Sequence, residues 1–259
     1  MLILLPPSES KAAPKRGKSL AVDDLSFRAL EEPRGLVLTA LQRLCAGDPE
    51  FAARALGLGR TQGDDVRRNA RLLDTPTARA DAIYTGVLYE ALDLPSLDTA
   101  ARRRASTSLA ITSSLFGLLR PADRIPPYRL SGGVNLAGVG VVSARWRAVL
   151  DPVVREAAGN GLIVDLRSST YAAFWRPDRD LAARVAPVRV LHQVGSQRMV
   201  VSHFNKATKG HLVRGLLERG SSPSTPERLA DEIADLGWQV ELHKSGRHGQ
   251  QVDVIVEEL

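Results

Sequence analysis

Apolar runs and helical spacings alternate along this chain and predict a mixture of strands and helices. Met1–Leu5 is an apolar run that stops at Pro6-Pro7, which is typical of a buried strand because proline lacks the N–H that a strand ladder needs. Between Ser26 and Leu73, leucine and phenylalanine recur at roughly helical intervals and predict two or three packed helices. One strand followed by a helical N-terminal part is therefore expected.

The remaining elements are short and unevenly spaced. Apolar runs between glycine, proline and polar residues predict strands at Ser108–Leu115, Leu162–Leu166, Val188–Val194, Met199–Phe204, Gln239–Leu242 and Val252–Val256. Helical spacing predicts helices at Leu97–Arg104, Trp146–Ala158, Lys206–Arg219 and Pro226–Leu236, with a further one capped near Ser168 and running to Trp175. The even βαβ period of a doubly wound fold is absent. We therefore expect an α+β fold with a mixed β-sheet, in a single compact domain over residues 1–259.

The composition is that of an ordinary globular protein. The chain has 259 residues, 44% hydrophobic and 25% charged, which argues against a disordered or collagen-like chain. Its single cysteine excludes an internal disulfide, a four-cysteine zinc site and a CxxC redox motif. The N-terminal apolar run is too short for a signal peptide or a membrane span. These features predict a soluble, cytoplasmic protein with no membrane partner.

The charge balance points to an anionic partner. There are 35 Lys and Arg residues against 29 Asp and Glu, a formal net charge of +6, which suits nucleic acid or a nucleotide phosphate. Most of the cations are arginines, and a base-composition bias explains such usage equally well. Lysines are scarce, so those that lie inside polar motifs carry more information.

Polar and charged side chains gather in five segments that are candidates for a functional site. Ser8–Lys11 follows the first predicted strand, and ligands bind open sheets beyond the carboxyl ends of such strands. The other segments are Tyr84–Thr85, Ser113–Leu130, Asp165–Tyr171 and Lys206–Arg214. Each also has a purely structural explanation. These are a polar turn, a packed tyrosine, arginines paired with Asp123 and local carbonyls, a serine helix cap and a solvated helix face.

A sixth segment contains two glycines between predicted helices. Gly57, Gly59 and Arg60 lie where a hairpin between helices could present backbone amides to a DNA phosphate, although glycine also ends many helices. The histidines show no convincing metal-ligand spacing, since His203 and His211 are eight residues apart and His243 lies in a polar segment. We therefore expect no metal site and no cofactor.

Several motifs occur together in a familiar order. They are Ile3–Glu9 with Lys11, Tyr84–Gly86, Phe116–Pro121 with Pro127–Leu130, Asp165 with Ser168 and Tyr171, and Asn205–Gly210. This series resembles the YaaA family of peroxide stress proteins, most specifically between Phe116 and Leu130. The resemblance implies a cytoplasmic protein that limits oxidative DNA damage. It also implies a mixed α/β shape, a basic cleft, a helix–hairpin–helix-like element and affinity for duplex or bulged DNA. Around Tyr171 the chain departs from the family pattern at Asp165, Arg167 and Thr170.

Two functions are consistent with these residues. The resemblance favours a DNA-binding protein that limits oxidative damage. The alternative is an enzyme acting on a nucleotide, nucleoside or nucleobase, with Asp165, Glu9 or Tyr84 as catalytic groups. In either case the predicted binding residues are Ser8, Lys11, Thr85, Arg120, Tyr128, Arg129, Ser168, Ser169, Tyr171, Lys206, Lys209 and Arg214. A third possibility is a scaffold whose loops only brace the fold, and the oligomeric state stays open.

Overall fold

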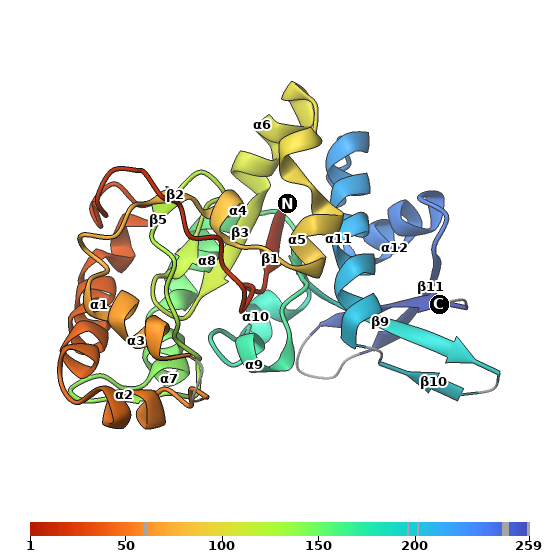
Figure 1. The fold of residues 1–259 in the computed structure, drawn as a ribbon. Helices are drawn as coiled ribbons and strands as arrows, with labels where there is room; N and C mark the ends of the chain where they lie inside the picture. The colour runs from red at the N-terminus through yellow and green to blue at the C-terminus, as the bar shows by residue number, and fades with distance from the viewer. Residues whose placement is uncertain (60–61, 196, 201, 245–248, 258–259) are drawn as a thin grey trace.

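The main β-sheet runs through the middle of the molecule (Figure 1). The computed structural model describes residues 1–59, 62–195, 197–200, 202–244 and 249–257. In this part of the chain the strand order is β11-β12-β9-β8-β1-β3-β4, and β10 pairs with the end of β9. The strands are β1 (Leu2–Leu5), β3 (Leu109–Ser113), β4 (Gly117–Leu119), β8 (Ile163–Asp165), β9 (Val185–Val194), β10 (Gln197–Met199), β11 (Gln239–Lys244) and β12 (Gln250–Val256). Two-stranded pairs are formed by β2 (Ala78–Arg79) with β5 (Arg124–Ile125), and by β6 (Asn135–Leu136) with β7 (Gly140–Val141).

The register of β1 determines where the site forms. All four residues of β1 are buried, and the strand pairs in parallel with β3 and with β8. Because parallel strands share a direction, the carboxyl ends of β1, β3 and β8 lie at one edge of the sheet. At the two ends of the strand order, β4 and β11 are antiparallel to their neighbours. The sheet is therefore mixed, which confirms the predicted α+β fold.

Helices pack around the sheet and form most of the N-terminal part. They are α1 (Glu31–Ala46), α2 (Pro49–Ala55), α3 (Gly63–Ala70), α4 (Ala80–Ile83), α5 (Val87–Leu92), α6 (Thr99–Ser108), α7 (Val142–Arg147), α8 (Leu150–Ala158), α9 (Ser169–Ala172), α10 (Arg179–Ala182), α11 (Ser202–Arg219) and α12 (Pro226–Asp235). Single 3-10 turns occur at η1 (Arg28–Leu30) and η3 (Leu94–Ser96). The expected helical N-terminal part is confirmed by α1, α2 and α3. Among the described helices, none is both long and apolar enough to cross a membrane.

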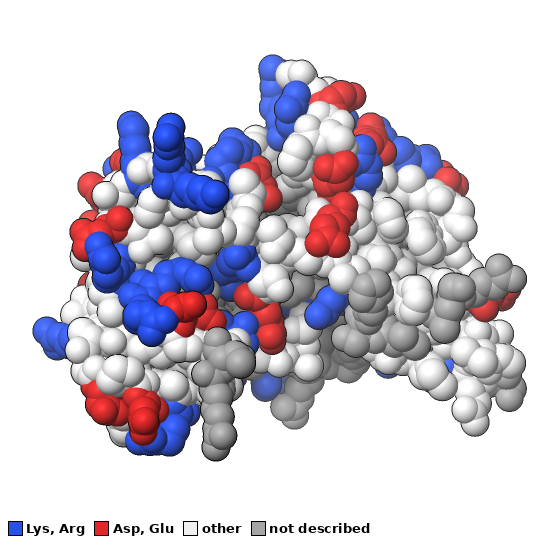
Figure 2. All heavy atoms as spheres, viewed as in Figure 1, with Lys and Arg blue, Asp and Glu red and all other residues white. Residues whose placement is uncertain are grey.

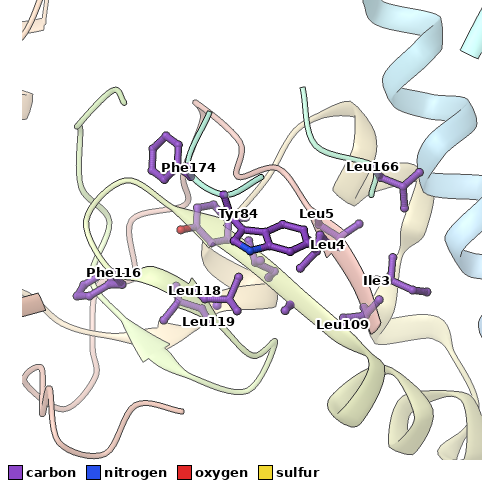
Figure 3. Packing of buried hydrophobic residues seen from close by; sticks show 14 of the residues in the cluster. Ile3, Leu4, Leu5, Tyr84, Leu109, Phe116, Leu118, Leu119, Leu166 and Phe174 are labelled. Carbon is purple, nitrogen blue, oxygen red and sulfur yellow. The ribbon is translucent and has the colours of Figure 1, made fainter. Parts of the chain in front are cut away.

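One hydrophobic core joins the N-terminal helices to the sheet. It extends from Leu2 through buried residues of every main layer to Val254 of β12. Figure 3 shows Ile3, Leu4 and Leu5 of β1 near Leu109 of β3 and Leu166, which follows β8. This packing fixes the carboxyl edge of the sheet, because each strand that ends there is anchored by buried side chains.

The predicted helix Trp146–Ala158 is two helices. The break falls between Arg147 of α7 and Leu150 of α8. Trp146 is fully buried and its indole N–H donates to the Ser114 carbonyl at 2.8 Å, which fixes the position of α7. Pro152 lies in the first turn of α8, where its missing N–H is tolerated.

The predicted strand Met199–Phe204 is largely helical. Pairing with β9 ends at Met199, and α11 begins at Ser202. The Phe204 ring packs against His192 of β9, with ring centroids 5.6 Å apart. This contact holds the first turn of α11 against the sheet, so tertiary packing overrides the strand propensity of the local sequence.

Candidate functional site

The candidate site lies at the carboxyl edge of β1, β3 and β8. The chain leaving β1 passes Pro6-Pro7 and comes back against Tyr84, with which Lys11 forms an isolated β-bridge. Asp165 ends β8 and pairs in register with Leu4 of β1. This arrangement brings together nine of the predicted residues. We call the group the carboxyl-edge site: Ser8, Glu9, Lys11, Tyr84, Tyr128, Arg129, Asp165, Tyr171 and Lys209.

Lys11 is a half-buried amine in this site. Its Nζ donates to the carbonyl of Ser8 at 2.9 Å and to that of Glu9 at 3.4 Å. The same nitrogen lies 4.4 Å from the centre of the Tyr128 ring and 5.4 Å from that of Tyr84. Burial, assisted by the charge of Arg129, lowers the pKa of Lys11 to about 7. A large part of the amine is therefore uncharged at neutral pH.

The depressed pKa of Lys11 makes stability depend on pH. Between about pH 7 and 10.5 the unfolded chain keeps the Lys11 proton and the folded chain releases it, so stability rises with pH. Between pH 7 and pH 9 we expect the free energy of unfolding of wild type to rise by about 1–2 kcal/mol relative to that of Lys11→Met. The expected rise is smaller than for a fully buried lysine, because solvent reaches part of the side chain. Urea denaturation at each pH measures this. Lys18→Met, at an exposed position, is the control. The prediction would be contradicted if wild type gained as much stability relative to Lys18→Met as relative to Lys11→Met.

All four tyrosines of the chain gather beside Lys11. The Tyr84 and Tyr89 rings stack with centroids 5.6 Å apart, and the hydroxyls of Tyr84 and Tyr128 are 2.9 Å apart. Tyr89 donates to the Pro6 carbonyl at 2.7 Å, which ties the turn after β1 to α5. Tyr171 is near enough to raise the pKa of both Tyr89 and Tyr128. Tyr84, predicted as a catalytic group, is buried, and its ring packs against the Lys11 amine.

A chain of buried hydroxyls underlies the tyrosine cluster. The Phe116 N–H donates to Ser113 Oγ at 3.0 Å, and Ser113 Oγ is 2.8 Å from the Tyr128 hydroxyl. Tyr128 then contacts Tyr84. Burial raises the pKa of Tyr84 and Tyr128 well above that of an exposed phenol, so both stay protonated at neutral pH. Ser113 lies in the polar segment that the sequence singled out, but its contact with Tyr128 depends on the fold.

Asp165 and Lys209 form the second charged group of the site. Both Asp165 carboxylate oxygens accept from Arg167, at 2.8 Å each. Burial alone would raise the pKa of Asp165, but the charge and hydrogen bonds of Arg167 outweigh it and hold that pKa below its ordinary value. Lys209 Nζ donates to the Leu166 carbonyl at 3.0 Å, and burial lowers the pKa of Lys209 to about 8. The site thus contains a paired carboxylate and two lysines with depressed pKa values.

Glu9 and Arg129 form the accessible side of the site. Their charged groups are 3.5 Å apart, with the Glu9 side chain 81% exposed and that of Arg129 28% exposed. Asn69 of α3 holds the Arg129 backbone by accepting from its N–H at 3.0 Å and donating to its carbonyl at 2.7 Å. Arg129 is therefore fixed in place while its guanidinium still faces solvent in part.

Two predicted arginines lie elsewhere and brace the fold. Arg120 donates to the carbonyls of Thr107 and Leu109, at the amino end of β3, opposite the site. Its backbone N–H donates to Asp123, as the structural explanation of this loop expected. Arg214 donates to the Leu92 and Asp93 carbonyls at the C-terminal end of α5.

The remaining predicted residues lie on exposed or half-buried surface. Thr85 is half-buried, and its N–H donates to the Ser10 carbonyl at 3.3 Å. Ser168 occupies the N-cap position of α9, but its side chain makes no capping hydrogen bond, and it is exposed, as is Ser169. Lys206 is exposed on α11 and makes no ion pair within the part of the chain that is described. These side chains are available to a ligand.

The predicted hairpin lies between α2 and α3. Gly57 has φ +66°, a conformation that favours glycine, and the Gly59 N–H donates to the Gln62 side-chain oxygen Oε1 at 2.9 Å. Arg60, the third residue of this prediction, lies outside the described residues. The resemblance to a helix–hairpin–helix element stays a prediction.

A cluster of arginines that the sequence did not single out adjoins the site. Arg67, Arg68 and Arg71, at the end of α3, line a hollow of about 360 Å³. Arg68 and Arg129 both act on the charge of Lys11. Three arginines at positions 67, 68 and 71 of the sequence could have indicated this cluster. Arginine is so common throughout the chain that they did not stand out. Within the described residues, no group of His, Cys, Asp or Glu is arranged to hold a metal ion.

Comparison with known proteins places this chain in a family. The family model for peroxide stress protein YaaA matches residues 1–242. The chain belongs to the YaaA family of peroxide stress proteins. Among its relatives, a UPF0246 protein of Streptomyces coelicolor is 51% identical over 100% of both chains. UPF0246 proteins of Corynebacterium efficiens and Corynebacterium glutamicum strain R are 38% and 36% identical, over 94% and 99% of this chain and 96% and 100% of theirs. The YaaA resemblance read from the motifs is thereby confirmed.

Proposed function

We propose that this YaaA-family protein acts in peroxide stress by binding DNA and limiting its oxidative damage. The predicted basic cleft corresponds in this proposal to a basic face, which we define by its residues: Lys15, Arg16, Lys18, Arg67, Arg68, Arg71 and Arg129. Arginine and lysine side chains of this kind bind phosphates without reading the base sequence.

The observation that carries the proposal is the gathering of cations from separate segments next to the carboxyl-edge site. The Lys18 carbonyl accepts from the Thr77 N–H and hydroxyl at 3.0 and 2.8 Å, which places the loop after β1 alongside the arginine hollow. Figure 2 shows many Lys and Arg side chains on the left-hand half of this face, over the N-terminal part of the chain, with some Asp and Glu side chains among them, and further charges of both signs along the upper right. Within the described residues, neither Lys18 nor Arg71 makes an ion pair.

Removing two of these cations is expected to weaken DNA binding in a salt-dependent way. For Lys18→Ala/Arg71→Ala, the slope of log affinity against log salt should fall by about 2, because each phosphate contact contributes about 0.9. Fluorescence anisotropy with a duplex oligonucleotide between 50 and 200 mM salt, as a rough working range, measures the slope. Arg102→Ala/Arg103→Ala removes two exposed charges from α6 and should leave the slope unchanged. Undetectable duplex binding at low salt would rule out the proposal.

A second candidate function is an enzyme that acts on a nucleotide, nucleoside or nucleobase. It is favoured by one observation: at the carboxyl edge of parallel strands Asp165 lies near Lys209, Glu9 lies near Lys11, and both lysines have depressed pKa values. Asp165→Asn distinguishes the two functions, since a DNA-binding protein should keep its affinity and an enzyme should lose turnover. Lys206→Ala should cause only a modest, salt-dependent loss of DNA affinity but should also stop an enzyme.

A further inference from the structure

The Lys11 amine is held in a way that leaves its lone pair free. An uncharged amine has two N–H groups and one lone pair. The two carbonyls of Ser8 and Glu9, at 2.9 and 3.4 Å, receive the N–H groups. The Tyr128 and Tyr84 rings lie within 5.4 Å of the same nitrogen and restrict the side chain further. The lone pair is then the part of the amine that can still react. The side chain is only half-buried, so a ligand can approach it.

The groups around this nitrogen suit a carbonyl compound that carries a phosphate. Lysine amines that burial keeps uncharged are nucleophiles toward aldehydes and ketones. Glu9 is an exposed carboxylate beside Arg129 and can accept and return protons as the addition proceeds. Arg129 and Arg68 act electrostatically on Lys11, so a phosphate bound by them would lie near the amine.

DNA that has lost a base provides this combination of groups. Its exposed deoxyribose has an aldehyde at C1′ in the ring-opened form and a phosphate on either side. Oxidation of DNA produces such sites, and the chain belongs to a family of peroxide stress proteins. Intact DNA offers the phosphates without the aldehyde.

We propose that Lys11 captures the aldehyde of abasic DNA as a reversible imine. This inference rests on the proposed DNA-binding function and names its ligand class. The Lys11 nitrogen adds to C1′: a C–N bond forms, the C=O π bond breaks, and one N–H proton moves to the carbonyl oxygen, giving a carbinolamine. Glu9 then takes the second N–H proton and delivers it to the hydroxyl, which leaves as one water as the C=N bond forms. No oxidant or reductant takes part, and water reverses the reaction by hydrolysis.

Reductive trapping tests the proposal. The full chain is incubated with a duplex oligonucleotide that contains one aldehydic abasic site, and borohydride then reduces any imine to a stable secondary amine. We expect a covalent protein–DNA adduct whose peptide mass spectrum places the DNA remnant on Lys11. An adduct found only on other lysines or on the terminal amine would overturn the proposal.

Two arginine substitutions make the test specific. Lys11→Arg keeps a long basic side chain that can still bind phosphate but removes the nucleophilic amine, and it should lower the adduct yield at least tenfold. Lys244→Arg makes the same change on exposed β11, at the far end of the sheet order, and should trap as well as wild type. Thermal melting shows whether Lys11→Arg is folded. If it is not, competition by hydroxylamine with wild type gives a second measurement, and an adduct that hydroxylamine leaves undiminished overturns the proposal.

The failure of this inference can be told apart from failure of the proposed function. Binding of an intact duplex is measured in parallel with trapping. If the protein binds the intact duplex but forms no adduct, the imine proposal is overturned and the DNA-binding proposal stands. No duplex binding, with trapping of glycolaldehyde phosphate on Lys11, overturns both the DNA function and abasic DNA as the ligand, and favours the enzyme candidate.

Discussion

Replacing Arg167 with methionine is expected to destabilise the protein by about 3–5 kcal/mol, because it leaves a buried carboxylate without its partner. The Arg167 side chain is 3% exposed and that of Asp165 is 11% exposed. Besides both carboxylate oxygens, Arg167 donates to the carbonyls of Tyr171 and Trp175 at 3.2 and 3.0 Å. One substitution therefore unpairs a charge and removes the contacts that hold the segment after β8.

Urea denaturation at pH 7 measures this effect, and a double variant identifies its cause. Arg167→Met/Asp165→Asn removes the unpaired charge and should recover about 1–3 kcal/mol of the loss. Arg54→Met breaks the exposed Glu50–Arg54 pair, whose side chains are 87% and 69% exposed, and should change stability by less than about 0.5 kcal/mol. A loss below about 1 kcal/mol for Arg167→Met would show that water reaches Asp165 and screens it.

The sequence predicts the location of those site residues that lie at the ends of apolar strands. An apolar run stopped by two prolines identifies β1, and the polar residues that follow it must lie at the carboxyl edge. Asp165 at the end of another apolar run was found by the same reasoning. Both strands proved parallel neighbours, which brings Lys11 and Asp165 to one edge.

The supporting contacts could not be predicted, because they join residues far apart in the chain. Tyr128 contacts Ser113 and Tyr84 across 15 and 44 residues, and no local pattern encodes those contacts. The low number of tyrosines was the one available signal. At Arg120 a local motif was misleading. The motif suggested phosphate binding, but the guanidinium donates to the carbonyls of Thr107 and Leu109.

The two predicted roles of the site use different parts of it. Phosphate binding requires the exposed cations of the basic face, which neighbouring carboxylates partly neutralise. Asp64 and Asp65 pair with Arg67 and Arg68, respectively. The amine chemistry requires burial, which comes from the tyrosines and from the chain leaving β1. A surface substitution should therefore change affinity without changing Lys11, whereas a core substitution beneath the site should change both.

Replacing Gly210 with alanine is expected to destabilise the protein by about 2–3 kcal/mol, because α11 and α5 are in backbone contact there. A Cβ on Gly210 would lie 2.7 Å from the Ala91 Cβ and 2.9 Å from the Leu92 nitrogen, and closer still to the Leu88 carbonyl. Backbone atoms cannot rotate away, so α11 must shift. Lys209 precedes this residue, and the shift would lengthen its 3.0 Å hydrogen bond to Leu166.

Gly35 provides the matched control within the same chain. It lies inside α1, and a Cβ there would meet no atom within 4 Å. Gly35→Ala should therefore stabilise by about 0.5–1 kcal/mol, because alanine favours the helix and restricts the unfolded chain. Opposite signs for the two substitutions in urea denaturation would show that the close approach of α11 to α5, rather than helix propensity, determines the effect at Gly210. Stabilisation by both substitutions would show that α11 can move away from α5 without loss.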